Sequence, residues 1–208
     1  SVDAVLGKIK SDMEIMGLQY NTFTQWRVTL PWAISVTAGV SMNFLEYTIN
    51  DYFNIALHKS QSGYKRFDPV IAPRVAVQKV FNEHITAYVD ISQGYSPPTT
   101  AQMIVPYLGT ANTSLKPEMG MQYEIGSKGT FFKNKLSYQV ALFDLQITNK
   151  LVNQAIPNTP AGNNETVNVG GQENKGAELV IAYNMINETK LLSYLRPFVS
   201  YTYLNCTY

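Results

Sequence analysis

The sequence is poor in cysteine and in charge. Its single cysteine, Cys206, allows no internal disulfide, and this count leaves the redox compartment undecided. Charged residues make up 15% of the chain, below the roughly 25% of ordinary soluble domains. The 16 basic and 15 acidic residues give a net charge of +1, which excludes the broad basic surface of a nucleic-acid-binding protein. We therefore expect no nucleic-acid partner.

Long apolar runs and enzyme motifs are also absent. The longest apolar runs, such as 179–183, have about five or six residues, whereas a membrane-spanning helix needs roughly 18. The sequence has no Gly-x-Ser-x-Gly, no phosphate-binding glycine-rich loop and no His-Glu-x-x-His. Its two histidines, His58 and His84, belong to no cluster with metal-ligand spacing. We therefore expect no catalytic residues, no metal site and no cofactor.

The sequence is rich in aromatic residues and in strict alternation. Aromatic residues make up 12% of the chain, and 14 of them are tyrosines. Every second residue from Trp32 to Phe44 is apolar, and the same period of two recurs in 119–125 and 177–185. This period predicts an all-β protein. We expect eight strands, at about 13–29, 32–47, 69–81, 84–95, 118–130, 135–149, 171–186 and 193–208.

The connections between these strands alternate in length. Short ones fall at 30–31, 82–83, 131–134 and 187–192, and long ones at 48–68, 96–117 and 150–170. In an antiparallel up-and-down sheet all the long loops lie at one end, which is the pattern of an outer-membrane β-barrel. Most of the strands are long enough for the roughly 9–11 residues that span a bilayer. The apolar face would then contact membrane lipid and the polar face the lumen.

One segment carries a motif. Residues 112–129 contain Asn-x-x-Leu-Lys-Pro-Glu followed by Tyr-Glu-x-Gly-x-Lys-Gly. Proline at 117 disfavours helix in the residue before it, so the segment is interpreted as an extended entry into a strand that builds the sheet. The motif resembles the hallmark of TonB-dependent outer-membrane receptors. Its residues here are Asn112, Leu115, Lys116, Pro117, Glu118, Tyr123, Glu124, Gly126, Lys128 and Gly129.

The resemblance covers nearly the whole chain and has specific implications. Such receptors are 22-stranded barrels of Gram-negative outer membranes, with a plug domain in the lumen. They import a scarce ligand, commonly a ferric siderophore or another iron chelate, with energy from the TonB complex, and they are not enzymes. Residues 1–208 would be part of such a barrel domain, without the plug. Carbohydrate or vitamin cargo stays open.

The site residues follow from this resemblance and from charge. A cationic, aromatic loop suits an anionic ferric chelate, through charge-assisted hydrogen bonds and stacking. The candidates are His58, Tyr64, Lys65, Arg66 and Tyr107. A second group lies at the alternate strand positions that would point into the lumen. It consists of Arg74, Asp90, Glu124 and Glu178. Arg74 would either meet the plug or transport path, or pair with Asp90 or Glu124.

Three other classes of protein stay open. A small, complete eight-stranded barrel with a structural or adhesive role would refold alone in detergent. An outer-membrane hydrolase would lose activity when His58 is replaced by alanine. A soluble β-sandwich would need no detergent, although its strands usually have only about 5–6 residues.

Overall fold

The computed structural model describes residues 12–53, 61–106, 108–185 and 195–208. Two of the candidate residues, His58 and Tyr107, and the predicted turn at 187–192 lie outside the described residues. Within them, no helix is long and apolar enough to cross a membrane. The elements in chain order are β1 (Met13–Leu30), η1 (Pro31–Ala33), β2 (Ile34–Asp51), β3 (Gly63–Arg66), β4 (Val70–Asn82), β5 (Ile85–Ser96), α1 (Thr100–Met103), β6 (Ile104–Val105), β7 (Thr110–Ala111), β8 (Glu118–Phe131), β9 (Leu136–Ala155), β10 (Asn164–Tyr183) and β11 (Phe198–Thr207).

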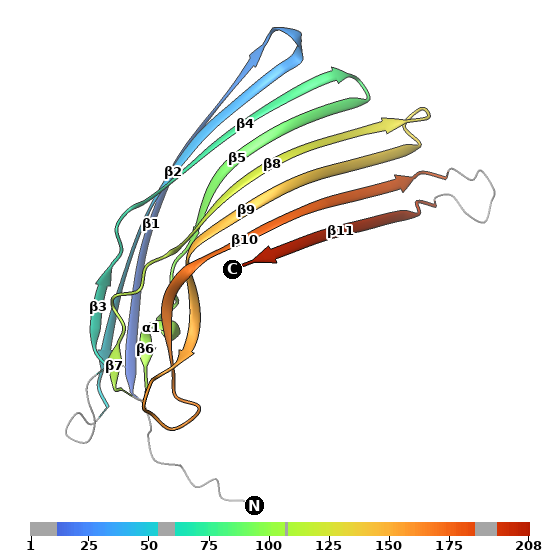
Figure 1. Ribbon diagram of the computed structural model, residues 1–208. Helices are drawn as coiled ribbons and strands as arrows, with labels where there is room; N and C mark the ends of the chain where they lie inside the picture. Colours follow the sequence, from blue (N-terminus) through green and yellow to red (C-terminus); the bar gives the residue numbers. More distant parts are fainter. Residues whose placement is uncertain (1–11, 54–60, 107, 186–194) are drawn as a thin grey trace, which may run out of the picture.

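One large antiparallel sheet forms most of the molecule. Its main path is β1-β2-β4-β5-β8-β9-β10-β11, so that each strand pairs with the next long strand in the chain. The sheet is strongly curved, with the tight turns at one end and the longer connections at the other (Figure 1). The all-β, antiparallel, up-and-down architecture predicted from alternation is confirmed. In the described part of the chain β1 and β11 are the two edges, and they do not pair with each other.

The register separates the two faces of the sheet row by row. One row crosses all eight strands of the main path with apolar residues only: Val28, Val36, Val77, Val89, Ile125, Leu142, Ala177 and Tyr203. The row beside it points to the opposite face because side chains alternate along a strand. That row contains Arg27, Thr37, Ala76, Asp90, Glu124, Phe143, Gly176 and Leu204. One face is thus apolar in this region, and on the other face every strand of the main path from β1 to β8 contributes a polar residue to the row except β4, which contributes Ala76.

The strand boundaries differ from the prediction at the ends that carry the long connections. β9 continues to Ala155 and β10 starts at Asn164, so the predicted long loop at 150–170 is wrong, and only 156–163 connects the two strands. The extra residues mix polar and apolar side chains on both faces, and the period of two therefore gives a weak signal there. Their ladder is reinforced by side chains, for example by the Thr166 hydroxyl, which donates to Asn153 Oδ1 at 2.8 Å.

The other two long connections contain short elements that the apolar alternation did not predict. β3 extends the sheet beside β2, and β6 pairs with β7 in a separate small ladder. The helix α1 is one turn long and starts with a capping box. Gln102 N–H donates to the Thr99 hydroxyl, while Thr99 N–H donates to Gln102 Oε1.

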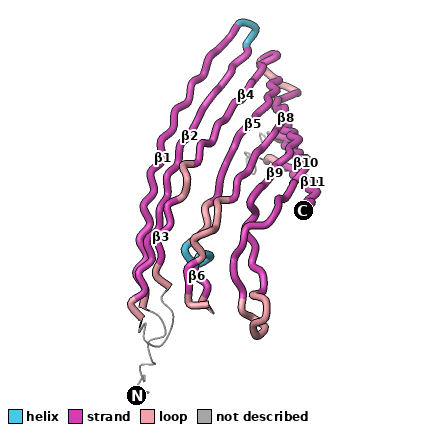
Figure 2. The backbone as a smooth tube through the Cα atoms, turned by 60° about the vertical axis from the view of Figure 1, so that its left-hand side comes forward, coloured by secondary structure: helices cyan, strands magenta, loops and turns pink. Residues whose placement is uncertain are grey.

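The buried core lies among these connections, below the wide part of the sheet. It is a cluster of Leu45, Phe67, Met103 and Leu115, with Tyr47 and Leu151 packed against it. Leu45 and Tyr47 share a face of β2, and the other buried members come from the segments after β3, in α1 and before β8. Figure 2 shows these segments gathered at the end of the sheet opposite to the tight turns. The long connections are therefore packed structure, and they position any site at this end.

Candidate functional site

The polar face carries a continuous hydrophilic surface over β1 to β8. We call it the concave polar surface, and it lines a hollow of about 560 Å³. Its polar residues are Gln25, Arg27, Ser35, Thr37, Arg74, Gln78, Tyr88, Asp90, Ser92, Gln122, Glu124 and Lys128. Each projects from an alternate position of its strand, which leaves the apolar positions for the other face. The surface can bind a polar partner that lies inside the curve of the sheet.

Two hydrogen-bonded groups organise the concave polar surface. Arg74 Nε donates to Asp90 Oδ2 at 2.8 Å, which settles the partner of Arg74 among the described residues. The Tyr88 hydroxyl donates to Glu124 Oε1 at 2.6 Å, and Gln122 Nε2 donates to Glu124 Oε2 at 2.8 Å. Because the Arg74 side chain is half exposed, this ion pair contributes little stability. These hydrogen bonds hold the carboxylates of Asp90 and Glu124 in fixed positions.

Glu178 lies on the same face by register. It pairs with Ala141 of β9, which pairs with Gly126 of β8, and Gly126 pairs with Tyr88 of β5. The four candidate lumen residues therefore share the concave side. In the row of Glu124 the same face has no polar side chain on β9 to β11, where Phe143 lies over Gly176 and Leu204 follows on β11.

The candidate loop residues are divided between two faces. Tyr64 donates its hydroxyl proton to Glu46 Oε2 at 2.9 Å, and this hydrogen bond raises the pKa of the Tyr64 hydroxyl. Arg66 pairs with Glu46 in the register, so that it shares this face. Lys65 has the opposite parity, and its ammonium lies 5.4 Å from the centre of the Phe67 ring. The structure therefore brings Tyr64 and Arg66 together but separates them from Lys65.

The motif at 112–118 is fixed to the neighbouring strands by side-chain amides and a carboxylate. Asn112 Nδ2 donates to the carbonyl of Thr166 at 3.0 Å. Asn168 holds the backbone of Lys116 on both sides, because Lys116 N–H donates to Asn168 Oδ1 at 2.7 Å and Asn168 Nδ2 donates to Lys116 O at 2.9 Å. Glu118 Oε1 accepts the N–H of Leu151 at 2.7 Å. These contacts support the interpretation that the motif builds the barrel wall.

The glycines of the motif make room for aromatic rings. A Cβ on Gly126 would lie 2.5 Å from the hydroxyl oxygen and Cζ of Tyr88. The absence of that atom lets Tyr88 lie across the strand and reach Glu124. Gly129 does the same for Tyr138, whose ring stacks on Phe131 at 5.5 Å between ring centres. The one aromatic residue of the motif, Tyr123, projects to the apolar face.

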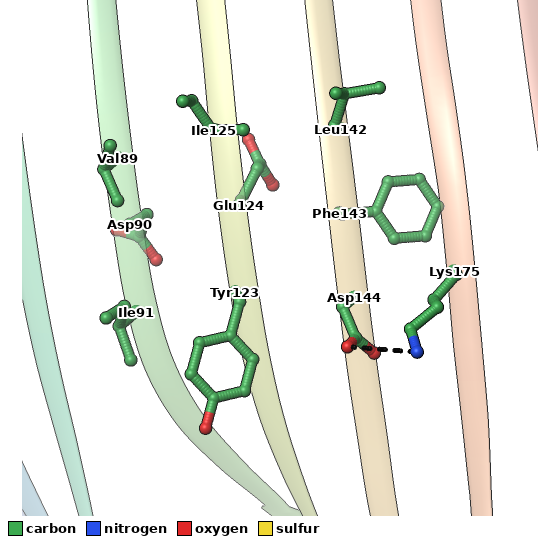
Figure 3. A pocket seen from close by; sticks show the side chains of 10 residues that line it. All are labelled: Val89, Asp90, Ile91, Tyr123, Glu124, Ile125, Leu142, Phe143, Asp144 and Lys175. Atoms are coloured by element: carbon green, nitrogen blue, oxygen red, sulfur yellow. Dashed lines mark ion pairs between the residues drawn. The ribbon is translucent and has the colours of Figure 1, made fainter.

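The apolar face has a trough of about 410 Å³ between β5 and β10 (Figure 3). Its apolar walls are Val89, Ile91, Ile125 and Leu142, all but the last from β5 and β8. Polar groups stand only at one end, where Lys175 lies 3.9 Å from Asp144 Oδ2 and 2.7 Å from Glu173 Oε1. The apolar surface therefore has a defined edge, at which charged side chains and the Tyr123 ring replace the aliphatic ones.

Sequence reasoning did not select Asn168 as a site residue, although its three hydrogen bonds hold the motif in place. The third is from Nδ2 to Asn149 O at 2.8 Å. A local signal exists, since Asn168 begins the Asn-Val-Gly segment at 168–170 that also fits the family. In the described ranges, no three histidine, cysteine, aspartate or glutamate side chains are grouped so that they could hold a metal ion.

Antiparallel topology, one apolar face and one polar face define a section of a β-barrel wall. The family model for the β-barrel of TonB-dependent receptors matches residues 15–208. The chain therefore belongs to the TonB-dependent receptor β-barrel family, in agreement with the resemblance of its motif.

Solved structures give the same fold. The chain is similar to the copper transporter OprC, with a TM-score of 0.70 and 13% identity over 92% of this chain. It is similar to the alcaligin outer-membrane receptor FauA from Bordetella pertussis, with a TM-score of 0.65 and 16% identity over 94%. It is also similar to the ferric citrate transporter FecA in its unliganded form, with a TM-score of 0.65 and 14% identity over 95%.

The chain spans 28%, 31% and 27% of these three structures, respectively. No curated protein matches the chain. At these identities the similarity shows the fold, and the cargo and partners of the whole protein are matters for proposal.

Proposed function

We propose that the chain is part of the barrel of an outer-membrane receptor that imports a ferric siderophore or another iron chelate. The observation that supports this most directly is the pair of adjacent rows across eight strands, one apolar throughout and the other polar from β1 to β8 apart from Ala76. A barrel in a bilayer needs an apolar band outside and a polar lumen inside. Similarity to the ferric citrate transporter FecA supports iron cargo.

The remaining strands, the plug and the coupling to TonB belong to this proposal. β1 and β11 are free edges in the described residues, and a barrel in lipid must satisfy such edges by pairing. Further strands of the same receptor would pair with them. A plug domain would then face the concave polar surface, with Arg74, Asp90, Glu124 and Glu178 at the contact. The cargo contacts expected at His58, Tyr64, Lys65, Arg66 and Tyr107 remain a prediction.

Iron uptake by whole cells tests the proposed function. We expect deletion of the gene in iron-starved cells to reduce the uptake of one ⁵⁵Fe-loaded chelate by at least about tenfold, since steering by a specific site raises association rates by that order. A plasmid copy should restore uptake, and a protonophore should abolish it. The panel should include ferric citrate, a catecholate, a hydroxamate and copper. Unchanged uptake of every iron chelate, with loss of copper uptake instead, would contradict the iron assignment.

A further inference from the structure

At the edge of the apolar face β4 and β5 stop pairing and separate, and we call the opening between them the seam. β4 pairs with β5 only from Arg74 and Ser92 onward. β2 and β4 continue to pair as far as Val70, and β5 and β8 continue to Ser96. The strands therefore divide into two groups beyond this point, and Figure 2 shows β4 and β5 running apart there. The segments before β4 and before β8 enter this seam.

A hollow of about 410 Å³ lies between those two segments. Its lining carries three cations, Lys65, Arg66 and Lys116, and one carboxylate, Asp68. None of the three cations forms an ion pair with another described residue. Lys116 is held in place through its backbone by Asn168. Lys65 shares the face of Tyr47 and lies over the Phe67 ring on the inner side, so that Arg66 and Lys116 are the cations of the outer side. Against Asp68 they leave the outer side of the hollow with an excess of one positive charge.

The hollow faces the apolar side of the sheet. Ile71, which lines it, lies on the apolar face with 53% of its surface exposed, and Met119 has the parity of Tyr123 and Ile125 on the same face. Phe67 and Leu115 line the inner side and are buried in the loop core. These two side chains close the seam toward the concave face. A ligand of the cationic hollow therefore approaches from the outside, next to the apolar band.

We propose that the cationic hollow binds the phosphate of a membrane lipid in the leaflet next to the long connections. Arg66 offers a planar fork of donors to phosphate oxygens, and Lys116 acts as a point charge. The acyl chains of the same lipid would lie over Ile71 and Met119, which continue into the apolar band below. The position at the edge of that band and the charge excess together favour a lipid headgroup over a soluble anion.

This proposal assigns Arg66 to a headgroup, whereas the iron-uptake proposal gives it to the cargo. The test uses the full-length receptor in detergent micelles, with lipid A as a phosphate-bearing glycolipid probe. Native mass spectrometry measures the fraction that retains one lipid. The variant Arg66→Gln/Lys116→Gln is compared with Lys133→Gln/Lys135→Gln, which removes two cations from the tight turn at the opposite end.

We expect the Arg66→Gln/Lys116→Gln variant to bind lipid A about 20-fold more weakly, at about fivefold for each cation near a headgroup. The control variant should bind as the wild type does, and phosphatase-treated lipid A should bind as weakly as the variant binds the intact lipid. Equal binding by all three proteins, an equal loss in the control, or retention of the dephosphorylated lipid overturns the proposal. Displacement of lipid A by ferric citrate also overturns it, since the hollow would then belong to the cargo.

Because iron uptake and lipid retention are separate measurements, the two proposals fail separately. Normal uptake by Arg66→Gln/Lys116→Gln together with weak lipid binding supports the headgroup assignment. Normal lipid binding with lost uptake refutes it and leaves the transport proposal in place.

Discussion

Replacing Gly129 with alanine should destabilise the barrel by about 1–3 kcal/mol, the usual cost of forcing a methyl group into packed structure. A Cβ at this position would collide with the carbonyl oxygen of His84 and would lie 2.7 Å from Cε1 of Tyr138. That carbonyl accepts the N–H of Thr130 at 2.9 Å, so the backbone has little freedom to move away. Urea unfolding of the full-length receptor in micelles, followed by its heat-modifiable migration on gels, measures the change.

Gly94 provides the matched control for this prediction. It lies on β5, and a Cβ there would have nothing within 4 Å. Alanine at this position should not perturb the folded structure. It should raise the free energy of unfolding by about 0.4–1 kcal/mol, because it restricts the unfolded chain. If both variants unfold at the same urea concentration as the wild type, close approach at Gly129 does not stabilise the barrel. The aromatic packing of Tyr138 would then need another explanation.

The parts of this fold that were predictable are those where one face is apolar. Between Trp32 and Phe44 the alternation is complete, and the register confirms that its members from Ile34 to Phe44 face one side, whereas Trp32 lies in the turn η1. The same reasoning failed for 150–170, since polar residues such as Thr166 and Asn153 lie in these strands and are joined by a hydrogen bond, Thr166 while buried. A period of two detects a strand through the contrast in polarity between its two faces. Where both faces mix polar and apolar residues, that contrast is weak.

For the candidate site, the face of the sheet on which each residue lies was predictable from the sequence, but the side chains that it contacts were not. Asp90 and Glu124 could be assigned to the polar face from alternation alone. The partner of each carboxylate depends on the lateral register of three strands, and register is determined by turn lengths and bulges that a period of two cannot resolve. Arg74 therefore had two possible partners until the register selected Asp90. The seam between β4 and β5 was not predictable either, because it depends on where the pairing of these two strands stops, and alternation along one strand does not report pairing.

The motif before β8 leads to the second large effect. Asn168→Ala removes three hydrogen bonds, two with the backbone of Lys116 and one with the carbonyl of Asn149. At about 1 kcal/mol for each bond, the segment before β8 should open more readily by about 3 kcal/mol. The Lys116 amide reports this directly, because its N–H loses its acceptor, Asn168 Oδ1. We expect its hydrogen exchange in the full-length receptor to accelerate by about 100-fold, the equivalent of that free energy.

Asn163→Ala is the control for this experiment, since Asn163 donates from its side chain only to the carbonyl of Pro160, in the exposed connection between β9 and β10. Exchange at Lys116 should not change in this variant. If Asn168→Ala also leaves the exchange unchanged, the side chain does not hold the segment. Lys116 would then not be preorganised for a headgroup, and a main support for the cationic hollow would be lost. Faster exchange at Lys116 alone, with the sheet amides of β8 unaffected, would show that Asn168 orders the seam without stabilising the barrel as a whole.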